Sequence, residues 1–119
     1  MTEVILLEDS GPLRRVLTQA LREAGYNVAA FEDGVISSDV GVMSQADLLI
    51  TDLSMPIVDG EEALRNIRET LPELRCVVIS GKPESELSGL ETSAVLRKPF
   101  EPDDLVSEVK KLLTPDALT

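Results

Sequence analysis

Hydrophobic positions along the chain form two patterns, short continuous runs and longer stretches with helical spacing. The continuous runs are Val4–Leu7, Val28–Phe31, Leu48–Thr51, Cys76–Ile79 and Ala94–Leu96. Runs of this length without alternation are typical of strands that are buried on both faces of a parallel sheet. The pattern therefore predicts five parallel strands.

Helical spacing occupies much of the sequence between these runs, and a regular alternation of strand and helix predicts a doubly wound α/β domain. The first helix has clear signals at both ends, because Ser10 is a good N-cap, Pro12 fits the first turn and Gly25 can end the helix. The second is weak, since it contains Gly41, two Ser residues and several β-branched residues. The expected helices run from about Leu13 to Gly25, Val35 to Met43, Gly60 to Leu71 and Pro102 to Leu113.

Composition narrows the class of protein. The 119 residues suffice for one domain, and 43% hydrophobic residues with only 3% aromatic residues predict an aliphatic core. A net charge of −11 argues against direct binding of nucleic acid or of an anionic membrane surface. The single Cys76 lies inside an apolar run, where we expect it to be buried and unpaired, as in a cytoplasmic protein. No apolar stretch is long enough to predict a transmembrane helix.

Polar residues follow four of the five predicted strands. Glu8 and Asp9 follow the first, Asp52 the third, Ser80 the fourth and Lys98 the fifth. Parallel strands bring these ends to one edge of the sheet, where open α/β domains bind ligands. Three carboxylates there would repel one another unless a cation compensates, and Mg²⁺ favours oxygen ligands of this kind. Together with a lysine and a hydroxyl group they predict a site for a phosphoryl group.

Each of these residues also has an ordinary explanation. Acidic residues after a strand commonly cap helices or form turns, Ser80 before Gly81 fits a turn, and Lys98 could be a solvated surface charge. The coincidence of all these residue types at four strand ends favours the shared site.

The chain resembles the response-regulator receiver domains of two-component signalling. The resemblance rests on Glu8-Asp9 after Val-Ile-Leu-Leu, on "TDLSMPIVDGEEAL" around Asp52, on Ser80 and on Lys98-Pro99-Phe100, and it covers the chain from Val4 to about Leu113. It implies a flavodoxin-like doubly wound (βα)5 fold with strand order 2-1-3-4-5. We expect residues 1–114 to form the receiver domain and residues 115–119 a short tail.

The resemblance also implies roles for the acidic residues. Asp52 matches the phosphoacceptor, which would take a phosphoryl group from the phosphohistidine of a histidine kinase or a histidine phosphotransfer domain. Asp9 matches the direct Mg²⁺ ligand and Glu8 the second acidic position. Ser54 would offer its backbone carbonyl to the metal. The protein would then be a signalling domain that promotes its own phosphoryl transfer and dephosphorylation and is not otherwise an enzyme.

Around the phosphoryl group, Ser80 matches the switch hydroxyl and Lys98 the residue that binds a phosphoryl oxygen. The resemblance implies a cis Lys98–Pro99 bond, which only a bond before proline forms at low cost. Gly60 matches a loop position before the third helix, where glycine suits an unusual backbone angle.

Two features depart from typical receivers. Val95 occupies the position of the usual aromatic switch residue, three before Lys98. The thirteen residues from Gly81 to Ser93 are few for a crossover between parallel strands, so we expect the fourth helix of the family to be short or absent. These departures concern the usual output face and leave the phosphoryl site complete.

Two alternatives remain open. A pseudo-receiver would keep the fold and bind partners without being phosphorylated, as the missing aromatic and the short crossover allow. A haloacid-dehalogenase-type phosphatase also uses an aspartate nucleophile and Mg²⁺, but it needs a second Asp two positions later, where this chain has Ser54.

Overall fold

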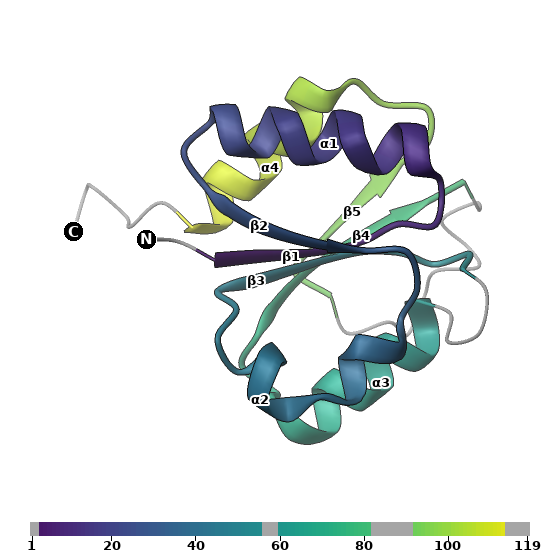
Figure 1. Ribbon diagram of the computed structural model, residues 1–119, viewed down its shortest axis with the longest axis vertical. Helices are drawn as coiled ribbons and strands as arrows, with labels where there is room; N and C mark the ends of the chain where they lie inside the picture. Colours follow the sequence, from purple (N-terminus) through teal and green to yellow (C-terminus); the bar gives the residue numbers. More distant parts are fainter. Residues whose placement is uncertain (1–2, 56–59, 82–91, 114–119) are drawn as a thin grey trace.

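Five parallel strands form a single sheet in the order β2-β1-β3-β4-β5 (Figure 1), which confirms the predicted topology. The computed structural model describes residues 3–55, 60–81 and 92–113. The strands are β1 (Glu3–Leu7), β2 (Asn27–Phe31), β3 (Leu48–Asp52), β4 (Arg75–Ser80) and β5 (Ala94–Arg97). In the described residues the helices are α1 (Gly11–Glu23), the 3₁₀ helix η1 (Val35–Ser38), α2 (Val40–Met43), α3 (Gly60–Thr70) and α4 (Pro102–Leu113).

Burial differs between the middle and the edges of the sheet. Every residue of β3 is buried, and so are all of β1 and β4 except the first residue of each. The edge strands are less buried, since β2 has one exposed residue and β5 alternates between half-buried and exposed positions. Continuous apolar runs therefore predicted the strands correctly, but burial on both faces holds only for the central three.

Helices cover both faces of the sheet. Figure 1 shows α1 and α4 on one face and α3 with η1 and α2 on the other. The helices on each face pack against the sheet and form a separate aliphatic core with it. The core under α1 and α4 contains Leu6, Leu17, Leu21, Ile50, Ile79, Leu105 and Val109 among its buried residues, and the core on the other face contains Leu7, Met43, Leu49, Ala63, Ile67, Cys76 and Val78.

The signals at the ends of α1 are confirmed. The Ser10 hydroxyl oxygen accepts a hydrogen bond from the Leu13 amide at 3.4 Å, and Pro12 lies in the first turn. Gly25, just beyond the helix, has a φ of 103°, which a residue with a side chain rarely adopts. The α4 boundaries also match the prediction, and α3 ends one residue earlier than predicted.

The predicted helix from Val35 to Met43 is wrong as one continuous element. Asp39 has an extended backbone, with φ −88° and ψ 92°, and divides the stretch into η1 and α2. Its side-chain oxygen accepts a hydrogen bond from the Val42 amide at 3.1 Å and so caps α2. Aspartate competes well for this capping role and poorly for a helix interior, which explains the break.

Cys76 is free and buried, as predicted. Burial raises the pKa of its thiol to about 11, although the nearby Arg68 lowers it in part. The Lys98–Pro99 peptide bond is cis, also as predicted. None of the helices in the described ranges is long and apolar enough to cross a membrane. The expected shortening of the crossover helix falls on residues 82–91 and the expected tail on residues 115–119, both outside the described residues.

Gly60 begins α3 at a point of very close contact with β3. A Cβ atom at this position would lie 2.6 Å from the Leu53 Cα and against the Asp52 backbone carbonyl. In the described residues the only glycine with a positive φ is Gly25, so Gly60 does not adopt the unusual backbone angle that we expected. Close approach between α3 and β3 requires glycine here instead.

Gly60→Ala should therefore lower the free energy of unfolding by about 1–3 kcal/mol, because backbone atoms must move to accept the methyl group. Urea denaturation followed by circular dichroism would measure the change. Gly11→Ala is the matched control, since its Cβ would meet only arginine side-chain ends at 3.9 and 4.0 Å. We expect that control to change the free energy by less than about 1 kcal/mol. Equal stability of the two variants would contradict tight packing at Gly60.

Candidate functional site

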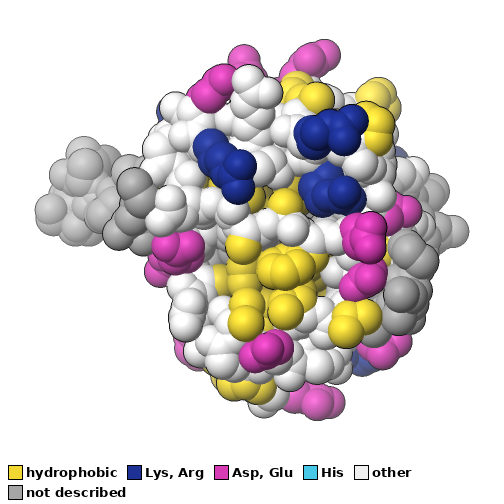
Figure 2. Space-filling model, viewed as in Figure 1, with side chains coloured by type: hydrophobic (Ala, Val, Ile, Leu, Met, Phe, Trp, Pro, Cys, Tyr) yellow, Lys and Arg dark blue, Asp and Glu magenta, His cyan; other side chains and the backbone are white. Residues whose placement is uncertain are grey.

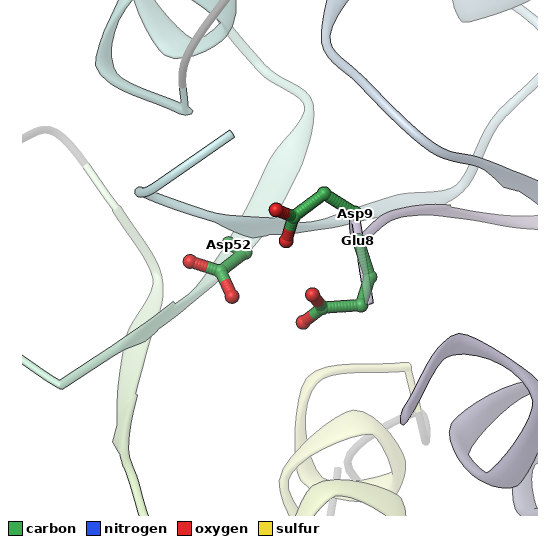
Figure 3. A group of neighbouring side chains, drawn as sticks. All are labelled: Glu8, Asp9 and Asp52. Carbon is green, nitrogen blue, oxygen red and sulfur yellow. The ribbon is translucent and has the colours of Figure 1, made fainter. Parts of the chain in front are cut away.

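Three carboxylates meet where β1 and β3 end. The two strands are parallel neighbours, with Leu7 beside Thr51, so the residues that follow them come together. Figure 3 shows the side chains of Glu8, Asp9 and Asp52 turned toward a common space. One oxygen atom from each lies within 4.8 Å of the others. The structure thus places all three predicted acidic residues in one cluster.

Glu8 is fully buried at 0% exposure. Its Oε2 accepts a hydrogen bond from the Ser10 amide at 3.0 Å, whereas Oε1 has no hydrogen-bond partner among the described residues. Burial raises the pKa of Glu8 to about 7; the Ser10 amide opposes this, and the neighbouring Asp52 and Asp9 reinforce it. A buried carboxylate oxygen without a hydrogen bond can be satisfied by a proton or by a bound cation.

Asp52 is almost as buried, at 2% exposure, but both of its oxygens have donors. The Ser54 amide donates to Oδ1 at 2.8 Å, and the Lys98 ammonium donates to Oδ2 at 2.5 Å. Lys98 also lies 3.9 Å from Oε1 of Glu8. Partial burial lowers the pKa of Lys98, but its hydrogen bond to Asp52 and the charges of the three carboxylates raise it on balance. Lys98 therefore stays protonated and compensates part of the negative charge.

Asp9 is exposed and marks the side of the cluster that is open to solvent. Buried Glu8, buried Asp52 and exposed Asp9 offer a set of oxygen atoms that could hold a hard divalent cation, as the strand-end pattern predicted. Because three carboxylates face one lysine, the site carries a surplus of negative charge that such a cation would relieve.

The remaining predicted residues lie at the same edge of the sheet. Ser80 ends β4 at 2% exposure, one residue beyond Ile79, the neighbour of Asp52 in the register. Its carbonyl accepts a hydrogen bond from the Lys98 amide at 2.9 Å, which fixes the start of the lysine segment. Ser54 is exposed, and its amide holds Asp52. A role for the Ser54 carbonyl in metal binding stays a prediction.

Arg14 is a supporting residue that the sequence did not reveal. Its guanidinium donates to the carbonyl of Glu8 at 2.9 Å and to that of Asp9 at 3.4 Å, so α1 holds the acidic segment in place. The sequence contained a faint signal, because a basic residue near the start of a helix opposes the helix dipole and needs another reason to be there.

A large cavity within the described residues lies away from this chemistry. It measures about 780 Å³ and lies between the ends of α2, α3 and α4, with Met43, Leu71, Leu74 and Leu113 in its lining. None of the acidic cluster contributes to it. The candidate functional site is therefore the cluster of charged groups and not this cavity.

Comparison with known proteins agrees with this geometry. The model of the response regulator receiver domain matches residues 4–110. The chain belongs to the response regulator receiver domain family. Over 119 residues it is 36% identical to the response regulator receiver protein CpdR of Brucella abortus, covering 95% of this chain and 98% of that relative.

Other relatives are longer than this receiver domain. The transcriptional regulatory protein ResD of Bacillus subtilis is 31% identical over 115 residues, which cover 94% of this chain but 48% of ResD. The response regulator MprA of Mycobacterium avium is 30% identical, with 92% of this chain and 50% of MprA covered. The chain thus spans nearly all of CpdR and about half of the other two.

Solved structures show the same fold. The response regulator TrrA of Thermotoga maritima, solved in complex with Mg²⁺ and BeF, superposes with a TM-score of 0.84 at 28% identity, covering 95% of this chain and all of TrrA. The chemotaxis protein CheY4 of Vibrio cholerae gives a TM-score of 0.83 at 25% identity, with 95% and 99% covered. The flavodoxin-like order of the receiver sheet is therefore established.

The raised pKa of Glu8 makes a prediction for the metal-free protein. The native state binds the Glu8 proton more tightly than the unfolded state, so this residue makes stability fall as pH rises from about 4.5 to about 7. Glu8→Gln removes that dependence. In a metal chelator, we expect the variant to be more stable than the parent at about pH 8, by roughly 1–3 kcal/mol, and nearly equal at about pH 5.

Urea denaturation at the two pH values would measure this difference. Glu69→Gln on the exposed surface of α3 is the matched control and should show the same change in stability with pH as the parent. A Glu8→Gln variant that is less stable than the parent at both pH values would contradict the raised pKa.

Proposed function

We propose that this receiver domain accepts a phosphoryl group on Asp52 from phosphohistidine, in a Mg²⁺-dependent reaction. The observation that carries the proposal is the environment of Asp52, a buried carboxylate with Lys98 at 2.5 Å and two further carboxylates within 4.8 Å. This set combines a nucleophile, a cationic side chain and oxygen ligands for a metal, which are the parts that phosphoryl transfer requires.

In the proposed step, one carboxylate oxygen of Asp52 attacks the phosphorus atom of phosphohistidine. The bond between phosphorus and the imidazole nitrogen breaks, its electron pair stays on the imidazole, and an acyl phosphate forms on Asp52. The Lys98 ammonium transfers its hydrogen bond from Asp52 to a phosphoryl oxygen. The Ser54 amide keeps the carboxyl group oriented.

Bound Mg²⁺ would supply positive charge for the phosphoryl oxygens, and Glu8, Asp9 and Asp52 are the residues that would hold it. Further proposed contacts are the Ser54 carbonyl with the metal and the Ser80 hydroxyl with the phosphoryl group. The Mg²⁺ and BeF in the TrrA complex support the proposal by likeness. The donor would be a histidine kinase or a histidine phosphotransfer domain, since this sequence contains no His.

Intact-mass spectrometry after incubation with phosphoramidate and Mg²⁺ tests the proposal. We expect a gain of one phosphoryl group that hydroxylamine removes, as it does from acyl phosphates. The gain should be lost in Asp52→Asn and in excess chelator, and kept in Asp103→Asn, which changes an exposed carboxylate on α4. A parent that stays unmodified would instead support the pseudo-receiver alternative, and failure to bind Mg²⁺ at millimolar concentration would strengthen it.

Lys98 can be tested separately through the rate of phosphorylation. Lys98→Ala should slow transfer from phosphoramidate by about 10²-fold or more, because it removes the cation that neutralises the phosphoryl oxygens. Lys111→Ala is the matched control, since Lys111 pairs only with Glu108 on the exposed side of α4 in the described residues. Equal rates for the two variants would rule out the proposed role of Lys98.

A further inference from the structure

An apolar groove with an acidic rim lies beside β2. It shares no lining residue with the carboxylate cluster, although the carbonyl of its residue Phe31 accepts a hydrogen bond from the Glu8 amide at 3.0 Å. We call it the η1–α2 groove. It measures about 690 Å³. Its lining consists of Phe31, Asp33, Val35, Ile36, Ser38, Asp39 and Val40. Figure 2 shows this face of the molecule, with hydrophobic side chains gathered near its centre and acidic side chains beside them.

The groove exists because the weak second helix is broken. Asp39 ends η1 and caps α2, and this turn leaves Val35 49% exposed and Val40 46% exposed. Only two other large hydrophobic residues in the described ranges, Val16 and Val95, are exposed to a comparable degree. Two such side chains around one hollow, next to the half-buried Phe31, are the kind of apolar surface that marks a binding site.

The walls of the groove are fixed by hydrogen bonds. The Asp33 side chain accepts from the Val35 amide at 2.9 Å and so holds the start of η1. Ser37 is 1% exposed, and its hydroxyl accepts from the side-chain amide of Asn66 on α3 at 3.0 Å. A groove that is already shaped before binding loses less conformational freedom when a partner enters it.

The charge around the groove is one-sided. Asp33 and Asp39 contribute carboxylates, and no Lys or Arg of the described ranges lines the groove. Neither aspartate forms an ion pair within the part of the chain that the structure describes. Arg14, Arg15 and Arg22 line a separate hollow beside α1. A partner with positively charged side chains facing Asp33 and Asp39 would therefore complement the charge of the groove.

We propose that the η1–α2 groove docks a segment of another protein that carries apolar side chains flanked by Lys or Arg. Apolar side chains of the segment would pack between Val35, Val40 and Phe31, and its basic residues would face Asp33 and Asp39. A second copy of this chain is a poorer occupant, because its net charge of −11 would bring like charges together. Addition of a strand to β2 is also disfavoured, since Arg22 already donates to the Val28 carbonyl at 3.0 Å.

The test uses synthetic amphipathic peptides and an isotope-labelled receiver domain, followed by amide chemical shifts. A peptide of Leu and Lys should shift the resonances of residues 31–40 most strongly. Peptides of the same pattern built from Leu and Glu, or from Ser and Lys, should bind at least about tenfold more weakly. Shifts spread evenly over the acidic surface, or equal binding of the Ser and Lys peptide, would overturn the proposal.

Paired variants separate the apolar contribution from general effects. Val35→Ser combined with Val40→Ser should weaken binding of the Leu and Lys peptide roughly tenfold or more. Val16→Ser is the matched control, because Val16 has the same 49% exposure but lies on α1. It should change affinity by less than about twofold. Similar losses in both variants would overturn the assignment of the groove.

A second pair tests the charge. Asp33→Asn with Asp39→Asn keeps the side-chain oxygens that accept from the Val35 and Val42 amides but removes two negative charges. This variant should weaken binding and reduce its salt dependence, whereas Asp103→Asn with Glu69→Gln, two exposed acids elsewhere, should not. Sedimentation analysis completes the set. Self-association of the parent that Val35→Ser with Val40→Ser abolishes would overturn the proposal in favour of a second copy.

Discussion

The repulsion among three carboxylates that share one end of the sheet is the constraint on which this structure depends. The parallel pairing of β1 and β3 brings Glu8, Asp9 and Asp52 within 4.8 Å of one another. Two of them are buried, where water cannot screen their charges. Lys98 compensates part of this charge. The pKa of Glu8 is still raised, mainly because the residue is buried and further because Asp52 and Asp9 lie beside it. Such a cluster lowers the stability of the fold, and features of this kind are typical of functional sites.

Much of the surrounding structure serves to keep these groups in place. Arg14 fixes the backbone of the acidic segment from α1, and the Ser54 amide orients Asp52 from the loop after β3. The missing side chain of Gly60 lets α3 begin directly against the backbone of Asp52 and Leu53. In each of these contacts one partner is a backbone atom. The packing of the sheet and its helices therefore sets the positions of the carboxylates. Such preorganisation would favour the proposed phosphoryl transfer.

The η1–α2 groove has a different physical basis. It depends on exposed apolar side chains and on surface aspartates that form no ion pair among the described residues, whereas the carboxylate cluster depends on burial and on Lys98. Asn66 joins η1 to α3, and α3 begins at the backbone of Asp52. A contiguous path of contacts therefore runs between the two regions.

The sequence by itself determined the element order, the caps of α1 and the residues that would meet at the edge of the sheet. These follow from local rules, because apolar runs mark strands and the carboxyl ends of parallel strands share an edge. Only the tertiary structure decided that Glu8 is buried while its neighbour Asp9 is exposed, and that Gly60 is required by close packing and not by its φ angle. It also broke the second helix at Asp39 and left Val35 and Val40 exposed. Burial and close approach depend on contacts between residues that are far apart in the sequence. A local sequence pattern does not contain information about those contacts.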